Sequence, residues 1–204
     1  MLIVFEGLDF SGKSTLISLL RDYLVLKTDK TVGVFAETYH SESGKKFLES
    51  VNDLPVCEQL KLLYKAREEC LRKANKYDIA IFDRYYYSSI VYQLPKCVDD
   101  NKSIKLLMQL FHFEKPDIVF FLKYNYDNYV KRSNLREKEM HEFDKMSNEI
   151  FNLRQTLYLA SIISSTEVDT LRCQSPKVCI VDTNRSIEES FEEIKNITNQ
   201  HILK

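Results

Sequence analysis

The sequence predicts an α/β protein built on a parallel sheet that helices cover on both faces. Five short apolar runs recur along the 204 residues, at positions 2–5, 31–36, 78–83, 116–122 and 178–182. Helical patterns separate the runs, and strands that alternate with helices are typical of parallel sheets. Each run is apolar at nearly every position, as expected for strands that are buried on both faces.

Length and composition predict one compact domain, residues 1–204. The chain has 44% hydrophobic residues, 29% charged residues and a net charge of −1, so no basic field indicates a nucleic-acid partner. No apolar run approaches the ~20 residues that cross a membrane, and the chain starts on its first strand with no room for a signal peptide. Five cysteines without a C-x-x-C spacing favour reduced thiols. We therefore expect a cytoplasmic protein that binds neither nucleic acid nor membranes.

The first strand runs into a phosphate-binding loop. Residues 7–14 are Gly7-Leu8-Asp9-Phe10-Ser11-Gly12-Lys13-Ser14, which reads G-x-x-x-x-G-K-[ST], and a helical pattern follows. The glycines let backbone N–H groups surround a phosphate, and the helix start adds favourable partial charge. Lys13 is placed to reach the outer phosphates, and the Ser14 hydroxyl to hold Mg²⁺. The alternative is a chance match in a turn that contains glycine.

The remaining segments divide into helices and polar connections. Residues 37–44 read as a polar loop, and residues 164–176 read as a polar connection with no assigned task. Helical patterns cover residues 45–51, 57–75, 103–113, 125–136 and 148–163, and others begin near residues 86 and 186.

Carboxylates stand at the ends of several predicted strands, where ligands bind in parallel sheets. Asp83-Arg84-Tyr85 follows the third strand. Arg84 would project beside the phosphate loop and grip an anionic oxygen, and Asp83 would contact Mg²⁺ or its waters. The alternative is a strand-end ion pair with a surface arginine. Residues 86–93 mix tyrosines with polar groups, which suits a pocket for a planar base or a half-buried helix.

These motifs together resemble the thymidylate kinase family of P-loop nucleoside monophosphate kinases. Phe5-Glu6-Gly7-Leu8-Asp9 with Gly12-Lys13-Ser14-Thr15 is similar to the family's F-E-G-x-D/E loop start. Asp83-Arg84-Tyr85, Ser88-Ser89 and Tyr92-Gln93 resemble its D-R-Y-x-x-S-S-x-A-Y-Q segment. The resemblance implies a three-layer P-loop kinase fold with a five-stranded parallel sheet and a mobile lid at about 132–144. It further implies ATP and Mg²⁺ as cofactors, deoxythymidine monophosphate as acceptor, and a homodimer.

The resemblance implies roles for single residues. The ATP site would comprise Gly7, Leu8, Asp9, Phe10, Ser11, Gly12, Lys13, Ser14, Thr15, Arg132 and Asp182, with Ser14 and Asp83 on the metal. The acceptor site would comprise Asp9, Leu63, Arg67, Arg84, Tyr85, Ser88, Tyr92, Gln93 and Phe143. The catalytic residues would be Lys13, Arg84, Arg136 and Asp9. In this scheme Asp9 binds the 3′-hydroxyl, Arg84 binds the acceptor phosphate, and Arg67 and Gln93 read the base.

The chain departs from the family pattern at several of these positions. Phe10 stands where members have a basic residue or glycine, so a lid arginine, Arg136, would supply the missing charge. Leu63 replaces a phenylalanine that stacks on thymine, which predicts a reshaped pocket that also admits dUMP or dGMP.

A second group of departures concerns the acceptor phosphate. Thr38 or Tyr39 stands near the place of an arginine that binds it. Lys45 and Lys46 are the candidates to replace that arginine.

Two other functions stay open on the sequence. A deoxynucleoside kinase needs a carboxylate after the second strand as general base, and Glu37 stands there. The alternative to this catalytic role is that Glu37 is a loop carboxylate paired with a basic neighbour. A non-catalytic nucleotide-binding paralogue is the other candidate. The apolar positions 104–111 would form a dimer surface or pack into the core. The dTMP kinase, which would feed dTTP synthesis, fits the most motifs.

Overall fold

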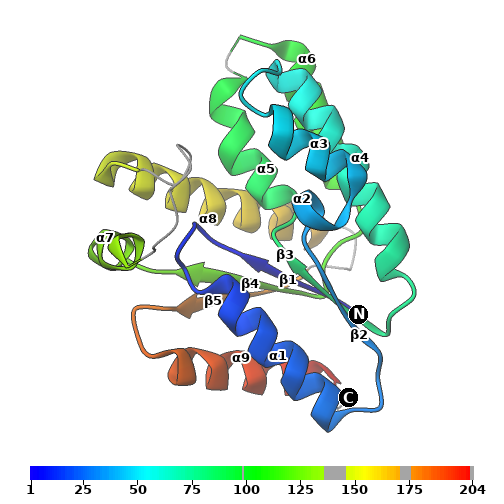
Figure 1. Ribbon diagram of the computed structural model, residues 1–204, viewed down its shortest axis with the longest axis vertical. Helices are drawn as coiled ribbons and strands as arrows, with labels where there is room; N and C mark the ends of the chain where they lie inside the picture. The colour runs from blue at the N-terminus through cyan, green and yellow to red at the C-terminus, as the bar shows by residue number, and fades with distance from the viewer. Residues whose placement is uncertain (98, 136–145, 171–175, 203–204) are drawn as a thin grey trace.

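The computed structural model describes residues 1–97, 99–135, 146–170 and 176–202. Within these residues, five parallel strands form one sheet in the order β2-β3-β1-β4-β5 (Figure 1). The strands are β1 (Leu2–Glu6), β2 (Val32–Phe35), β3 (Ile79–Asp83), β4 (Ile118–Lys123) and β5 (Lys177–Asp182). The predicted α/β fold class and the five-stranded parallel sheet are confirmed.

Helices cover both faces of the sheet and give three layers (Figure 1). One face carries α1 (Lys13–Lys27) and α9 (Ile187–Ile202). The opposite face carries α4 (Val56–Ala74), α5 (Tyr86–Gln93), α6 (Asn101–Gln109) and α8 (Asn148–Thr170). Two short helices, α2 (Glu37–His40) and α3 (Glu42–Ser50), follow β2, and α7 (Tyr126–Asn134) follows β4. Single 3₁₀ turns cover Leu94–Lys96 and Leu110–His112.

The alternation of side chains along the strands divides the interior into two cores. On β1, Ile3 and Phe5 pack with α1 and α9, whereas Leu2 and Val4 pack with the helices of the opposite face. All four side chains are buried. Glu6 is the next residue on the side of Leu2 and Val4, so its carboxylate enters the core that contains α4, α5 and α8.

The predicted polar loop at residues 37–44 is wrong, because these residues form α2 and the start of α3. The Ser41 hydroxyl donates to the Glu37 carbonyl at 2.5 Å and accepts from the Gly44 amide at 2.9 Å, so one side chain ends α2 and caps α3. A Cβ at Gly44 would lie 2.0 Å from the Glu37 carbonyl oxygen, so only glycine permits this approach.

The helix predicted to end at residue 163 continues to Thr170. The polar residue Ser165 is buried there because its hydroxyl donates to the Ile162 carbonyl at 2.7 Å and lies 3.1 Å from the Tyr87 hydroxyl. Positions 104–111, considered as a dimer surface, pack largely into the core: Leu107 and Leu110 are buried in it. Among the helices of the described residues, none is long and apolar enough to span a bilayer.

Candidate functional site

The phosphate loop lies between β1 and α1, as the sequence predicts. Gly7 has φ +146° and Gly12 has φ +89°, conformations that favour glycine. A Cβ at Gly7 would also lie 2.8 Å from the Leu122 carbonyl oxygen, so β4 leaves no room for a side chain there. The backbone therefore turns tightly at the carboxyl end of the sheet and delivers its N–H groups to the start of α1.

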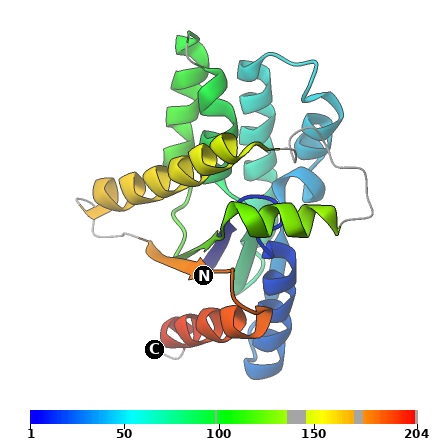
Figure 2. The ribbon, with the colours of Figure 1, turned by 90° about the vertical axis from the view of Figure 1, so that its left-hand side faces the viewer.

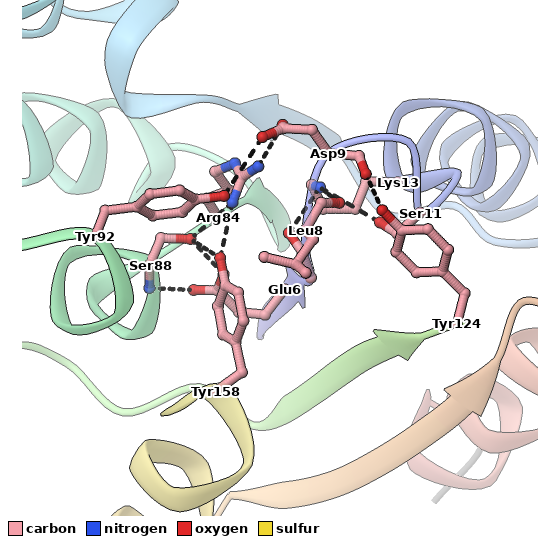
Figure 3. A network of polar contacts seen from close by, with 11 residues as sticks. Glu6, Leu8, Asp9, Ser11, Lys13, Arg84, Ser88, Tyr92, Tyr124 and Tyr158 are labelled. Atoms are coloured by element: carbon pink, nitrogen blue, oxygen red, sulfur yellow. Dashed lines mark hydrogen bonds and ion pairs between the residues drawn. The ribbon is translucent and has the colours of Figure 1, made fainter. Parts of the chain in front are cut away.

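Lys13 lies across this loop. Its Nζ donates to the carbonyls of Gly7 and Leu8, both at 2.9 Å, and more weakly to Ser11 Oγ at 3.4 Å (Figure 3). Burial and the nearby Arg84 lower the pKa of Lys13 to about 8. The backbone carbonyls of the phosphate loop thus hold the Lys13 ammonium in place.

Helix α7 and the turn after β5 enclose the phosphate loop. Phe10 has φ +66°, and its ring packs edge-on against Tyr129 of α7, with 5.8 Å between centroids. Arg132 of α7 donates to the Phe10 carbonyl at 3.0 Å and to the Thr183 carbonyl. Its guanidinium lies over the ring of Tyr124 at 5.4 Å. Figure 2 shows α7 crossing in front of the sheet between α8 and α9.

Arg84 and Asp9 meet at the centre of the site (Figure 3). Arg84 directly follows β3 with φ +71°, an uncommon conformation for this residue type. Its guanidinium donates to Asp9 Oδ1 at 2.6 Å, to the Tyr158 hydroxyl at 2.8 Å and to Ser88 Oγ at 3.2 Å. The Tyr92 hydroxyl donates to Asp9 Oδ2 at 3.4 Å.

The charges of this pair follow from its surroundings. Burial acts to raise the pKa of Asp9, but Arg84 and Lys13 outweigh it and hold the pKa at about 2. Burial likewise acts to lower the pKa of Arg84, and Tyr92 and Asp9 outweigh it. Both groups therefore remain ionised at neutral pH.

Glu6, the last residue of β1, holds the start of α5 next to this ion pair. Its buried carboxylate accepts hydrogen bonds from the Tyr85 amide at 2.8 Å, the Ser88 amide at 3.2 Å and the Ser88 hydroxyl at 2.6 Å. Helix α5 has no side-chain cap from its own N-cap residue, so a strand residue caps it instead. Burial raises the pKa of Glu6 to about 7, against the lowering effect of the Ser88 hydrogen bond.

A second polar group lies deeper, between α4 and α5. The fully buried Arg67 donates to the carboxylate of Glu37 at 2.5 and 2.8 Å, and to Ser89 Oγ at 3.2 Å. Its guanidinium lies between the rings of Tyr85 at 5.1 Å and Phe113 at 5.3 Å. Its second terminal nitrogen, NH1, has no hydrogen-bond partner among the described residues.

The residues assigned to a metal fit Mg²⁺. Asp83 Oδ1, at the end of β3, is buried without a hydrogen-bond partner in the described part of the chain, and Ser14 is exposed in the first turn of α1. Carboxylate and hydroxyl oxygens suit Mg²⁺, which takes few protein ligands and completes its shell with phosphate and water. The described residues contain no cluster of three or more His, Cys, Asp or Glu arranged for a metal.

A family model described as thymidylate kinase matches residues 5–194 of this chain. The chain belongs to the thymidylate kinase family. Membership in this family makes the protein a kinase with nucleotide substrates.

Named relatives are similar over most of the chain. The chain is 37% identical to "Probable thymidylate kinase 1" of Saccharolobus solfataricus, over 67% of this chain and 80% of that protein. It is 32% identical to "Thymidylate kinase" of Leptospira borgpetersenii, over 71% of this chain and 74% of that protein. "Probable thymidylate kinase" of Archaeoglobus fulgidus is 28% identical, over 97% of this chain and 94% of that protein.

In this thymidylate kinase family member, the residues predicted for catalysis and for the acceptor fall into three groups. Those that gather around the phosphate loop and the end of β3 are Asp9, Lys13, Arg84, Ser88 and Tyr92. A second group is buried on α4 and at either end of α5: Leu63, Arg67, Tyr85 and Gln93. Arg136, Phe143 and the rest of residues 136–144 of the predicted lid (132–144) lie outside the described residues.

Two of the predicted site residues, Tyr85 and Asp182, also have structural contacts of their own. Tyr85 lies beneath Arg67 and its hydroxyl donates to the Glu114 carbonyl at 2.9 Å, so it holds Arg67 in place. Asp182 shapes its own turn by accepting from the Asn184 amide at 2.9 Å.

Lys45 is bound to Glu42 at 2.9 Å and lines a surface groove with Tyr39 and Lys73. Lys45 and Glu42 are both largely exposed, so this ion pair is a surface contact.

Sequence reasoning missed three contributors to the site. These are the capping by Glu6, the Tyr158 hydroxyl on Arg84, and Arg154, whose guanidinium lies 4.8 Å from the ring centroid of Tyr92. Tyr158 and Arg84 are 74 residues apart, and no local pattern connects them.

Proposed function

We propose that the protein transfers the γ-phosphoryl group of ATP to deoxythymidine monophosphate and so forms the diphosphate. The observation that carries this proposal is the 2.6 Å contact between Arg84 and Asp9. In this contact an arginine from the end of β3 meets Asp9 of the loop proposed to bind the donor phosphates. Contacts for a donor and for an acceptor phosphate therefore lie side by side, as a transfer between two phosphates requires.

The donor side of this proposal uses the loop from Gly7 to Thr15. Backbone N–H groups at the start of α1 and the ammonium of Lys13 would bind the β- and γ-phosphates. Arg132 already connects the Phe10 and Thr183 carbonyls, so it would border the adenine at that end. Bound Mg²⁺, held by Ser14 and Asp83, would neutralise charge on the phosphates.

The acceptor side uses Arg84 for the phosphate and Asp9 for the 3′-hydroxyl of the deoxyribose. Asp9 is ionised at neutral pH, so it accepts a hydrogen bond there. Arg67 is the candidate for the base, because its NH1 is a buried donor without a partner among the described residues. Leu63 offers an aliphatic surface in place of a ring, so we propose that dUMP and dGMP are also accepted.

The chemistry needs no general base. The attacking oxygen of a nucleoside monophosphate is already ionised at neutral pH, so the protein has to align two anions and stabilise charge. Lys13 and Arg84 are the described cations placed for this task. Arg136, which lies outside the described residues, is the proposed source of further charge on the transferred group.

A deoxynucleoside kinase is the less supported reading. Its general base would be Glu37, but both oxygens of that carboxylate accept hydrogen bonds from Arg67. A carboxylate that is bound on both oxygens is poorly placed to take a proton from a 5′-hydroxyl. This geometry favours the monophosphate as acceptor.

The test is ADP release from ATP and Mg²⁺ with a panel of acceptors: dTMP, dUMP, dGMP, thymidine and deoxyguanosine. We expect turnover with dTMP, none with thymidine, and loss of turnover in Lys13→Met. Arg136→Ala should lower kcat more than it raises KM. Phosphorylation of thymidine without dTMP, or no acceptor above background, would overturn the proposal. Sedimentation of the same preparation tests the proposed homodimer.

A further inference from the structure

The acceptor end of the site contains a second arginine, Arg154, to which the roles above give no task. Arg154 lies on α8, and its guanidinium carbon is 4.8 Å from the ring centroid of Tyr92. The guanidinium carbon of Arg84 is 5.4 Å from the same centroid. Both distances are within the range of cation–π contacts. One ring therefore brings two arginines, from different elements, to the place where Arg84 meets Asp9.

The positive charge of Arg154 acts on Tyr92, which contacts the Asp9–Arg84 pair. Burial raises the pKa of Tyr92 to about 12, and Arg84 and Arg154 both act against the rise. The Tyr92 hydroxyl itself donates to Asp9 Oδ2 at 3.4 Å. Arg154 is thus separated from the Asp9–Arg84 pair by a single side chain, and it is half-buried where α8 packs against α5.

The charges already assigned do not match the substrates. Asp9 neutralises Arg84 through their 2.6 Å ion pair, and Asp83 lies close enough to Lys13 to raise its pKa against the effect of burial. These four groups together are close to neutral. ATP brings about four negative charges and a nucleoside monophosphate about two, of which a magnesium ion cancels about two. The acceptor phosphate therefore requires positive charge beyond Arg84.

The segment after β2 offers two cations, Lys45 and Lys46 of α3, and both are exposed. Thr38 and Tyr39 of α2 are uncharged, and Lys45 of α3 is paired with Glu42 at 2.9 Å. Arg154 of α8 contacts the same tyrosine ring as Arg84, and so it places a positive charge at the acceptor end.

We propose that Arg154 binds the phosphate of the acceptor nucleotide together with Arg84. This assignment rests on the proposed function, since it concerns the acceptor of that reaction. Arginine suits the task because its planar group offers several donors and stacks on an aromatic ring at the same time. Tyr92 aligns the two arginines, and the donor nucleotide is bound without Arg154.

The test compares the wild-type protein with Arg154→Met, Arg154→Lys and the matched control Arg21→Met. Arg21 is an exposed arginine in the middle of α1, paired with its neighbour Asp22 at 3.3 Å. Calorimetric titration measures the affinities for dTMP and ADP, and competition with dTMP measures that for thymidine. We expect Arg154→Met to weaken dTMP binding about tenfold to a hundredfold and to leave thymidine and ADP unchanged. Arg154→Lys should recover part of the loss, and Arg21→Met should behave as wild type.

Two results would overturn the assignment and leave the proposed function intact. Arg154→Met that binds dTMP within twofold of wild type would show that the phosphate does not use this side chain. An equal loss for dTMP and thymidine would show that Arg154 only supports Tyr92 or the helix. A failure of the proposed function is distinct from both, because wild-type protein would then bind no nucleoside monophosphate, which also refutes the assignment.

Discussion

The burial of the Glu6 carboxyl predicts how the free energy of unfolding depends on pH. Glu6 is fully buried beneath α5, and burial raises its pKa from 4.5 to about 7. Between these values the folded protein holds a proton that the unfolded chain has released. The free energy of unfolding must therefore fall as the pH rises through this window, and the fall ends above about pH 7.

The size of this effect follows from the pKa change. One pKa unit corresponds to about 1.36 kcal/mol, so ionisation of Glu6 costs the folded state about 3 kcal/mol. Glu6→Gln removes the ionisation and keeps a carbonyl oxygen for the Tyr85 amide. We expect the wild-type protein to lose about 3 kcal/mol more than Glu6→Gln between about pH 4.5 and pH 7.5.

Urea denaturation at several pH values measures this difference. The chain has 12 tyrosines and no tryptophan, so tyrosine fluorescence or far-ultraviolet circular dichroism reports unfolding. At a typical urea dependence of about 1–3 kcal/mol per molar, the midpoints should diverge by about 1 M or more. The control is Glu149→Gln, since Ser147 lowers the pKa of that exposed carboxyl. Parallel pH curves for wild type and Glu6→Gln would refute the reasoning.

Three further predictions concern the same network. The ratio kcat/KM for ATP should fall above about pH 8, because burial and Arg84 lower the pKa of Lys13 to about 8; a profile that stays flat to about pH 9.5 would contradict this. Glu37→Gln leaves Arg67 buried with a weaker partner, and urea unfolding should show a loss of about 3–5 kcal/mol; an unchanged midpoint would count against it. Tyr158→Phe removes the hydroxyl that accepts from Arg84, so steady-state kinetics should give a kcat/KM for dTMP about tenfold lower at an unchanged KM for ATP, whereas equal loss for both substrates would indicate general damage.

The strands and the outline of the site were predictable because their signals are local. Each strand is a continuous apolar run, and the carboxyl ends of parallel strands meet at one edge, which brings Asp9 and Arg84 together. Helix α2 and the start of α3 were not predictable, whereas the rest of α3 matches the helix predicted over residues 45–51. The unpredicted part depends on Ser41, which contacts Glu37 and Gly44, and on the close approach of Gly44 to a carbonyl. A polar composition hides such contacts, because the same residues favour loops.

Long-range partners explain what sequence reasoning missed in the site. Glu6 reads as part of the loop motif, yet its hydrogen bonds go to residues 79 and 82 positions away. The sequence offered a basic neighbour for Glu37 as an alternative, but not its identity as Arg67, 30 residues on. Such pairs are set by which helices pack on which face of the sheet, and no window of sequence contains both members.

The capping of α5 by Glu6 has a consequence for how this protein can be altered. One strand, β1, ends in the loop proposed to hold the donor and also fixes the start of the helix that carries Ser88 and Tyr92. Because side chains alternate along a strand, a shift of β1 by one residue would turn Glu6 into the opposite core and uncap α5. A phosphate loop grafted from another kinase would therefore need to bring a carboxylate at position 6 together with a hydroxyl at position 88. The end of β1 and the start of α5 would therefore have to be exchanged together.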